Sequence, residues 1–123
     1  MSRRVLLVDD EPAILEIYRL SLEYMGYEVL VAEGGIPAFD LWKNETCDIV
    51  VSDMRMPNGG GLQLLEKIRK ENKDFPVIIM TGFSDQLNEV RALNPQKVFT
   101  KPLPTQDLID EINQILTPKG APQ

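Results

Sequence analysis

The segment VLLVDDEP, residues 5–12, carries the clearest structural signal in the chain. Its first four residues form an unbroken apolar run, as expected for a strand that helices cover on both faces. Asp9 and Asp10 end this run, and Pro12 suits the first turn of a helix. The spacing after Pro12 predicts a helix with five residues facing the core: Ile14, Leu15, Tyr18, Leu22 and Met25. The segment therefore predicts a strand that leads directly into a helix, with two carboxylates at the junction.

The same alternation recurs along the rest of the chain. Four more short apolar runs follow at steady intervals, at residues 29–31, 49–51, 77–80 and 98–99. Helical spacing separates them, which predicts helices near 36–44, 62–72 and 85–93 and a last one with Leu108, Ile109, Ile112, Ile115 and Leu116 inward. Strands that alternate with helices are typical of an α/β domain with a parallel sheet.

The runs also predict the order of the strands. The first, third and fourth are almost wholly apolar, as in the centre of a sheet, whereas the second begins at Glu28 and the fifth is flanked by Lys97 and Thr100. Right-handed crossovers then favour the order 2-1-3-4-5. We therefore expect a (βα)5 three-layer sandwich over residues 3–117, with 118–123 as a flexible tail or the start of a linker.

Composition narrows the class of protein. The 123 residues suffice for one domain, no apolar run approaches the length of a membrane span, and the single Cys47 fits a reducing cytoplasm. A net charge of -6 disfavours direct nucleic-acid binding. The chain has no histidine, so His-based catalytic triads are excluded and any chemistry depends on carboxylates, hydroxyls, lysine or a hard metal ion.

Polar residues fall where the predicted strands end. Asp9 and Asp10 follow the first strand, Asp53 the third, Thr81 the fourth and Lys101 the fifth. Each taken alone has an ordinary explanation as a turn residue, a helix-start residue or a solvated lysine. In open α/β sheets, however, ligands bind beyond the carboxyl ends of the strands, near the switch in strand order. The sequence thus predicts that these side chains converge on one site.

Three neighbouring carboxylates repel one another unless cations lie between them. Lys101 is one candidate cation, and oxygen ligands without histidine or thiolate favour magnesium, manganese or calcium as another. A metal ion beside a carboxylate, a hydroxyl and an ammonium is an arrangement suited to phosphoryl transfer, in which the carboxylate can itself be the nucleophile. The product of that reaction is an acyl phosphate.

These residues resemble the receiver domains of two-component response regulators. The matching segments are VLLVDDEP at 5–12, DIVVSDMRMPNGGG at 48–61, PVIIMTG at 76–82 and TKP at 100–102. The resemblance implies a flavodoxin-like, cytoplasmic signalling domain that takes a phosphoryl group from a sensor histidine kinase or a histidine phosphotransfer protein. It implies a phosphoacceptor that assists its own phosphorylation and dephosphorylation, not an enzyme with turnover, and a signal that leaves through a protein-binding surface to a downstream protein.

The resemblance also assigns roles by position. Asp53 is the implied phosphoacceptor, Thr81 the hydroxyl that closes on the phosphoryl group, and Lys101 its charge partner. The implied ligands of Mg²⁺, with Mn²⁺ as a second candidate, are Asp10 directly, Asp9 largely through water, Asp53, and the backbone carbonyl of Arg55. Pro57 and Gly61 match the loop after the phosphoacceptor, and the Lys101–Pro102 peptide bond is expected to be cis. No other cofactor is implied.

Two departures from the family pattern concern the switch. Val98 stands where receivers usually carry an aromatic residue, and alternation along the strand directs Phe99 to the other face. The segment 94–97 replaces a common Gly-Ala turn, so the fourth helix is expected to be reshaped. These departures motivate an alternative, a receiver-like interaction module that works without phosphorylation. A phosphatase or a P-loop enzyme is a weaker alternative, because Met54 and Arg55 follow Asp53 without a second aspartate and no P-loop motif is present.

Overall fold

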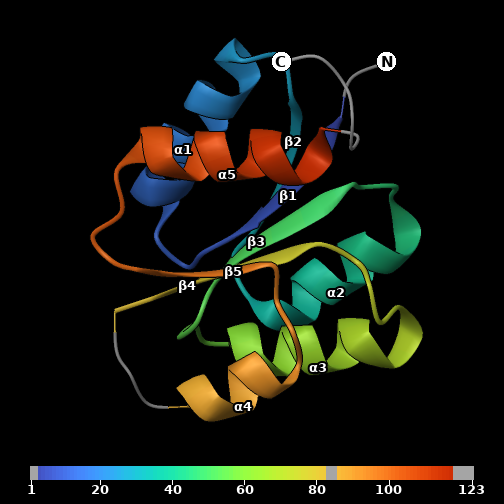
Figure 1. The fold of residues 1–123 in the computed structure, drawn as a ribbon. Helices are drawn as coiled ribbons and strands as arrows, with labels where there is room; N and C mark the ends of the chain where they lie inside the picture. The colour runs from blue at the N-terminus through green and yellow to red at the C-terminus, as the bar shows by residue number, and fades with distance from the viewer. Residues whose placement is uncertain (1–2, 83–85, 118–123) are drawn as a thin grey trace.

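The computed structural model describes residues 3–82 and 86–117, so the predicted tail at 118–123 lies outside the described residues. Strands and helices alternate along the chain (Figure 1). The strands are β1 (Arg4–Val8), β2 (Glu28–Ala32), β3 (Ile49–Asp53), β4 (Val77–Thr81) and β5 (Lys97–Thr100). The helices are α1 (Pro12–Tyr24), α2 (Gly35–Asn44), α3 (Gly61–Glu71), α4 (Leu87–Ala92) and α5 (Thr105–Leu116). No helix in these two ranges is long and apolar enough to cross a membrane.

The five strands form one parallel sheet in the order β2-β1-β3-β4-β5, which confirms the prediction. Every residue of β3 and β4 is buried, whereas β2 and β5 lie at the edges and keep exposed positions. The long apolar runs are therefore the central strands, because helices cover them on both faces.

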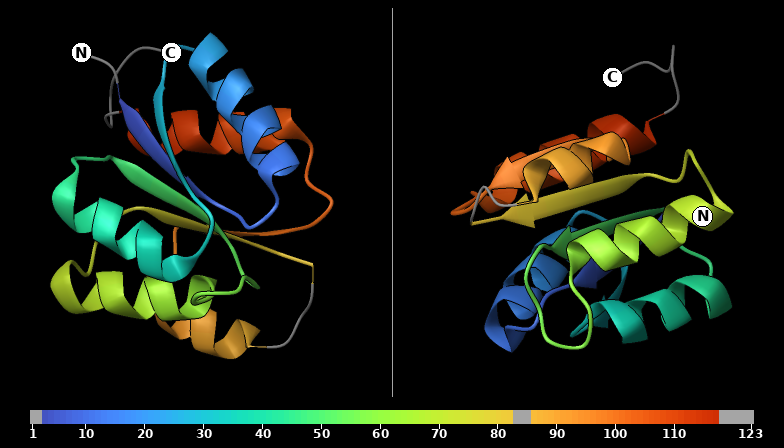
Figure 2. Two further views of the ribbon diagram at one scale, coloured as in Figure 1. Left: turned by 180° about the vertical axis from the view of Figure 1, so that it is seen from behind. Right: turned by 90° about the horizontal axis from the view of Figure 1, so that it is seen from below.

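Helices cover both faces of the sheet (Figures 1 and 2). One core includes side chains of α1 and α5, and the other includes side chains of α2, α3 and α4. Val98 packs against the α2–α3–α4 core and Phe99 against the α1–α5 core, so the two residues face opposite sides as alternation predicts. The arrangement is the flavodoxin-like three-layer sandwich expected from the sequence.

The ends of α1 follow local chemistry. Pro12 is its first residue, and the chain leaves the helix through Gly26, whose φ of 97° is a conformation that glycine adopts at little cost. Leu15, Tyr18 and Leu22 are buried as predicted. The expectation for Met25 was wrong: its side chain is 49% exposed, because α1 ends at Tyr24 and Met25 already belongs to the turn.

The side chain of Arg69 on α3 binds backbone carbonyls at the C-terminal end of the short helix α4. Nε of Arg69 donates to the Leu93 carbonyl at 2.8 Å, and its Nη atoms donate to carbonyls of Asn72, Phe75 and Asn94 at 2.7–3.3 Å. Asn94 takes the left-handed conformation, with φ of 52°, which asparagine adopts more readily than most residues. The guanidinium thus binds the C-terminal carbonyls of α4, which satisfies groups that a helix end leaves open.

An aromatic cluster joins α2 and α3 at the end of the sheet where β4 begins. Trp42 stacks on Phe39 with ring centroids 5.8 Å apart and meets the edge of Phe75 at 5.4 Å. The ammonium groups of Lys43 and Lys67 lie 5.4 and 5.5 Å from the centroid of the Phe39 ring. These contacts, together with the Lys43–Glu71 ion pair at 3.6 Å, tie the two helices together.

Candidate functional site

The strand register brings the predicted residues to one edge of the sheet. Val8 of β1 pairs with Ser52 of β3, so Asp9 and Asp53 follow side by side. Asp53 in turn pairs with Met80 of β4, which places Thr81 one residue beyond it. The backbone N–H of Lys101 donates to the Thr81 carbonyl at 2.8 Å, which continues the pairing of β4 with β5. Four adjacent strands therefore supply the candidate site.

The three carboxylates meet at this edge. One oxygen each of Asp9, Asp10 and Asp53 lies within 4.8 Å of the other two. Asp9 and Asp53 are buried, at 1% and 8% exposure, whereas Asp10 is partly open to solvent. The convergence predicted from the sequence is thus present in the structure.

Lys101 provides the positive charge beside the carboxylates. Its Nζ lies 3.1 Å from Oδ1 of Asp53 and 3.4 Å from Oδ2 of Asp9. The Lys101–Pro102 peptide bond is cis, as the resemblance implies. A single ammonium thus bridges the two buried carboxylates and holds their side chains at a fixed separation.

The two buried carboxylates are held in fixed orientations. Oδ1 of Asp9 accepts the backbone N–H of Glu11 at 3.0 Å while Oδ2 faces Lys101. Oδ1 of Asp53 accepts the backbone N–H of Met54 at 2.9 Å. Within the described part of the chain, no hydrogen bond or ion pair occupies Oδ2 of Asp53 or either oxygen of Asp10.

Burial and neighbouring charges shift the pKa values of the charged groups in the site. Burial raises the pKa of Asp53, and the nearby Asp9 adds to this effect, against the opposing influence of Lys101 and the Met54 N–H. Burial alone disfavours the charge on Lys101, but Asp53 and Asp9 outweigh it and raise the pKa of the ammonium. The site thus contains three carboxylates and one ammonium, which pairs with two of them, so negative charge remains that a cation can neutralise.

The loop after β3 is held close to Asp53 by its glycines and by α2. A Cβ atom on Gly61 would lie 2.5 Å from the Asp53 carbonyl, so glycine is required for α3 to begin this near the site. The N–H groups of Gly35 and Ile36, at the start of α2, donate to carbonyls of Gly59 and Asn58 at 2.7 and 2.9 Å. The helix end thus fixes the loop, a contact that sequence patterns did not reveal.

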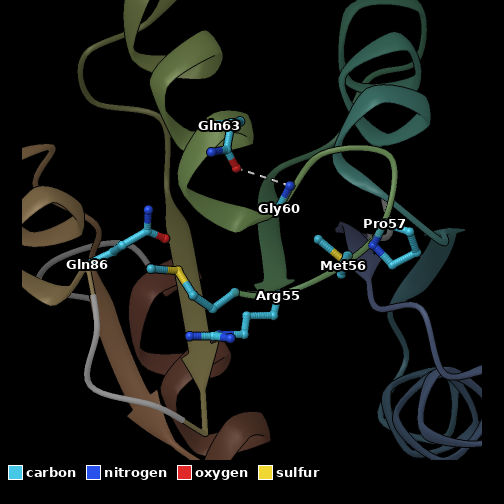
Figure 3. Close-up of a pocket in the computed structure, with 7 residues that line it drawn as sticks. Arg55, Met56, Pro57, Gly60, Gln63 and Gln86 are labelled. Atoms are coloured by element: carbon cyan, nitrogen blue, oxygen red, sulfur yellow. Dashed lines mark hydrogen bonds between the residues drawn. The ribbon is translucent and has the colours of Figure 1, made fainter.

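The remaining predicted residues lie around the carboxylates. Thr81 is 3% exposed at the end of β4. Arg55 is exposed on the loop after β3 and lines a cavity of about 580 Å³ together with Met56, Pro57 and Gln86 (Figure 3). Pro57 and Gly61 lie in this loop and at its end, as the resemblance implies.

Tyr18 is a neighbour of the site that the sequence analysis assigned only to the core of α1. Burial raises the pKa of its phenol, and the charges of Lys101, Asp9 and Asp53 also act on it. Its position on an apolar helix face was the signal for burial, and that signal gives no information about nearby charges. Tyr18 is therefore close enough to the cluster for its charges to act on the phenol.

The donor set fits Mg²⁺. This ion binds oxygen at about 2.0–2.1 Å, so oxygens on opposite sides of one ion lie about 4 Å apart. One oxygen from each of the three carboxylates lies within 4.8 Å of the other two, and no thiol or imidazole is present among them. A hard divalent cation would supply the positive charge that Lys101 alone does not.

Comparison with known proteins agrees with this geometry. The response regulator receiver domain model matches residues 5–113. The response regulator MprA of Mycobacterium sp. (strain KMS) is 32% identical over 118 residues, and the transcriptional regulatory protein GlrR of Escherichia coli (strain K12) is 36% identical over 115 residues. These matches cover 94% and 91% of this chain, but 51% of MprA and 26% of GlrR. The chain thus spans about half or less of these relatives.

Solved structures show the same fold. A CheY-like receiver domain protein from Methanospirillum hungatei superposes with a TM-score of 0.88 at 29% identity, covering 94% of both chains. The response regulator TrrA from Thermotoga maritima, solved in complex with Mg(2+)-BeF, superposes with a TM-score of 0.84 at 31% identity, covering 93% of this chain and 99% of TrrA. Because the family model matches residues 5–113, from β1 into α5, the chain belongs to the response regulator receiver domain family of two-component systems.

Proposed function

We propose that this receiver domain is a phosphorylation-dependent switch that accepts a phosphoryl group on Asp53 with the help of Mg²⁺. The proposal covers residues 3–117, with 118–123 as a tail or linker. The observation that carries it is the convergence of Asp9, Asp10 and Asp53 within 4.8 Å of one another beside Lys101. Such a cluster disfavours the folded state unless it binds a cation, so its presence favours a functional site over a structural role.

The metal ligands follow from the contacts. Asp10 has the most accessible carboxylate and is the proposed direct ligand, together with Asp53 and the backbone carbonyl of Arg55. Both oxygens of Asp9 already have protein partners, so Asp9 acts mainly through water. When bound, Mg²⁺, or Mn²⁺ in its place, supplies positive charge that reduces repulsion between Asp53 and an incoming phosphoryl group.

Oδ2 of Asp53 is the proposed nucleophile, because Oδ1 is held by Lys101 and the Met54 N–H. The P–N bond of a partner's phosphohistidine breaks as the new P–O bond forms in line, and the partner's imidazole leaves with the bonding electrons. Lys101 stays beside the transferred group, and the hydroxyl of Thr81 turns toward it. The domain accepts one phosphoryl group in each cycle and does not turn over a small substrate.

The energy for switching can come from the new charge. The phosphoryl group carries about -1.5 to -2 of charge in place of the single negative charge of the Asp53 carboxylate, and each charge-assisted hydrogen bond to it contributes roughly 1.5–3 kcal/mol. Full inversion of a two-state equilibrium requires about 5.5 kcal/mol of differential binding. A new contact from Thr81, together with a stronger contact from Lys101, which already lies 3.1 Å from Asp53, is the proposed source of this energy. Val98 stands where receivers usually carry an aromatic residue. Movement of Thr81 is therefore coupled to α4 through contacts other than an aromatic side chain at position 98.

A direct test is the intact mass of the protein after incubation with Mg²⁺ and a small phosphodonor such as acetyl phosphate. We expect the wild-type protein to gain one phosphoryl group, with no gain in excess chelator and none in Asp53→Asn. Asp40→Asn, which removes an exposed carboxylate on α2, serves as the control and should be phosphorylated normally. A mass gain that persists in Asp53→Asn contradicts the assignment, and no gain in the wild type favours the alternative, an interaction module independent of phosphorylation.

The phosphodonor is proposed to be a sensor histidine kinase or a histidine phosphotransfer protein, and a surface beside the site suits its docking. Ile17, Leu20 and Tyr24 project from one stripe of α1 with 53%, 54% and 90% of their areas exposed. Leu20 and Tyr24 also line a cavity of about 420 Å³ together with Thr105 and Ile109 of α5. Both helices begin within four residues of the site residues Asp10 and Lys101, so a partner on this patch can reach Asp53.

Leu20→Glu is expected to slow phosphotransfer from a phosphorylated histidine phosphotransfer domain at least about tenfold, since a buried charge in an apolar interface costs more than 1.4 kcal/mol. Phosphorylation by acetyl phosphate should be unchanged, because Leu20 lies outside the carboxylate cluster. Val31→Glu, at an exposed apolar position of β2, is the control. Equal slowing with both donors, or equal slowing by Val31→Glu, contradicts docking at α1.

The output is proposed to be a protein-binding surface that changes with phosphorylation, without direct contact between these residues and nucleic acid or membrane. The net charge of -6 supports this. GlrR is named a transcriptional regulatory protein, and most of its length lies outside the match with this chain. The single Cys47 and the family of the chain support a cytoplasmic location for the domain.

A further inference from the structure

A groove follows one side of α3, from the loop after β3 to the C-terminal end of α4. Two cavities of about 580 and 490 Å³ form it, and Gln63 lines both. Figure 3 shows the cavity nearer to the carboxylates, with Gln63 above it, Gln86 to the left and Arg55 below. The second cavity lies along α3 and reaches Leu93. We call the two together the α3–α4 groove.

The α3–α4 groove is positively charged although the chain is acidic. Its lining contains four cationic residues, Arg55, Lys67, Arg69 and Lys70, and one carboxylate, Glu66; the ammonium of Lys67 also contacts the Phe39 ring on α2. Lys70 has no carboxylate within ion-pair distance among the residues that the structure describes. The chain as a whole carries a net charge of -6, so the excess of cationic residues in this lining is opposite in sign to the chain average.

The charge of Arg69 is hydrogen-bonded but not neutralised. Its N–H groups donate to backbone carbonyls of Asn72, Phe75, Leu93 and Asn94 and to the side-chain carbonyl of Gln96, all of which are uncharged. Burial lowers the pKa of this guanidinium, and Asp74 acts on it only as a nearby charge. In the described ranges no carboxylate pairs with it directly, so its positive charge acts on whatever occupies the groove.

Apolar surface completes the groove. Met54 and Met56 line the cavity near the site and Leu93 lines the other. Methionine side chains adapt to differently shaped apolar groups, and the aliphatic stems of Lys67 and Lys70 add apolar area below their charged ends. The groove therefore offers two apolar positions separated by part of α3 and bordered by cations.

We propose that the α3–α4 groove binds an acidic segment of a partner protein, with apolar side chains of that segment at Met56 and Leu93. At physiological salt, charges interact over about 8 Å, so the local cations outweigh the more distant acidic residues. This binding does not depend on phosphorylation of Asp53, and it can be measured on the unphosphorylated chain. Failure of one proposal therefore leaves the other standing.

The test uses a fluorescent peptide of alternating glutamate and leucine and a matched peptide of alternating lysine and leucine. We expect the acidic peptide to bind the wild-type chain, with affinity that falls as salt rises, and the basic peptide to bind at least tenfold more weakly. Lys70→Glu should weaken binding of the acidic peptide about tenfold. Lys73→Glu changes the net charge equally at an exposed position outside the groove, and it should change the affinity less than twofold.

Amide chemical shifts locate the binding. The acidic peptide should shift the resonances of Gln63, Lys70 and Leu93 and leave those of α1 unchanged. The proposal is overturned if the two peptides bind equally, if Lys73→Glu weakens binding as much as Lys70→Glu, or if the shifts map elsewhere. Circular dichroism of both variants shows that a loss of binding is not a loss of fold.

Discussion

Asp53→Asn is expected to raise the free energy of unfolding of the metal-free protein by about 0.5–2 kcal/mol near neutral pH. The wild-type site holds three carboxylates and one ammonium, and burial already disfavours the charge on Asp53. Asn keeps an oxygen that accepts the Met54 N–H, and Lys101 retains Asp9 at 3.4 Å. The substitution thus removes repulsion while it keeps the hydrogen bonds.

The sign of the effect with pH follows from the raised pKa of Asp53. The folded state binds this proton more tightly than the unfolded state, so ionisation of Asp53 reduces stability as pH rises through the raised pKa. The advantage of Asn should therefore be present at neutral pH and disappear as pH falls below the unfolded carboxyl value of about 3.9.

Urea unfolding of both proteins in chelator, at several pH values, measures this difference. Adding Mg²⁺ should stabilise the wild-type protein more than Asp53→Asn, since a ligand that binds only the folded state stabilises it. If Asp53→Asn is less stable than the wild type at neutral pH in chelator, the carboxylates of the site do not destabilise the folded protein as expected.

Arg69→Ala is expected to destabilise the fold by about 2–3 kcal/mol, which lowers the melting temperature by roughly 6–15 °C. The change removes the donors that bind carbonyls at the end of α4 and before β4. Arg69→Lys should recover little of the loss, because an ammonium lacks the planar arrangement of donors that reaches several carbonyls.

The matched control is Lys70→Ala, the next residue on the same helix, which makes no hydrogen bond or ion pair with any residue that the structure describes. Its effect should stay within about 0.5 kcal/mol. Hydrogen exchange provides a local readout: in Arg69→Ala the amide of Gln96, which donates to the Val77 carbonyl at 2.8 Å, should lose protection. Equal losses of stability in both alanine variants contradict the expectation that the hydrogen bonds of Arg69 stabilise the fold.

Local sequence patterns predicted the layers and strand order because each element carries its own signal. Central strands were recognisable from the apolar runs of β3 and β4. An edge strand was recognisable from the polar residues beside β5. The failure at Met25 shows the limit of periodicity, since helical spacing continues past the residue at which the helix ends. The helix expected at 85–93 is described as α4 over Leu87–Ala92.

The candidate site was predictable because parallel strands end at a common edge. Once the order 2-1-3-4-5 is known, Asp9, Asp53 and Lys101 must lie near one another. The contacts that were missed depend on long side chains or on backbone groups far apart in the sequence. The bonds from Arg69 to the end of α4 and from the start of α2 to Asn58 and Gly59 have no periodic signature.

The chain contains one tryptophan, and its packing gives the molecule an intrinsic optical probe. Trp42 lies between Phe39 and Phe75, at the sheet end opposite the carboxylates, where its surroundings depend on α2 remaining docked against the segment before β4. Its emission should therefore report the loss of the folded state in both stability experiments without a label, and it should stay nearly constant when Mg²⁺ enters the distant acidic cluster.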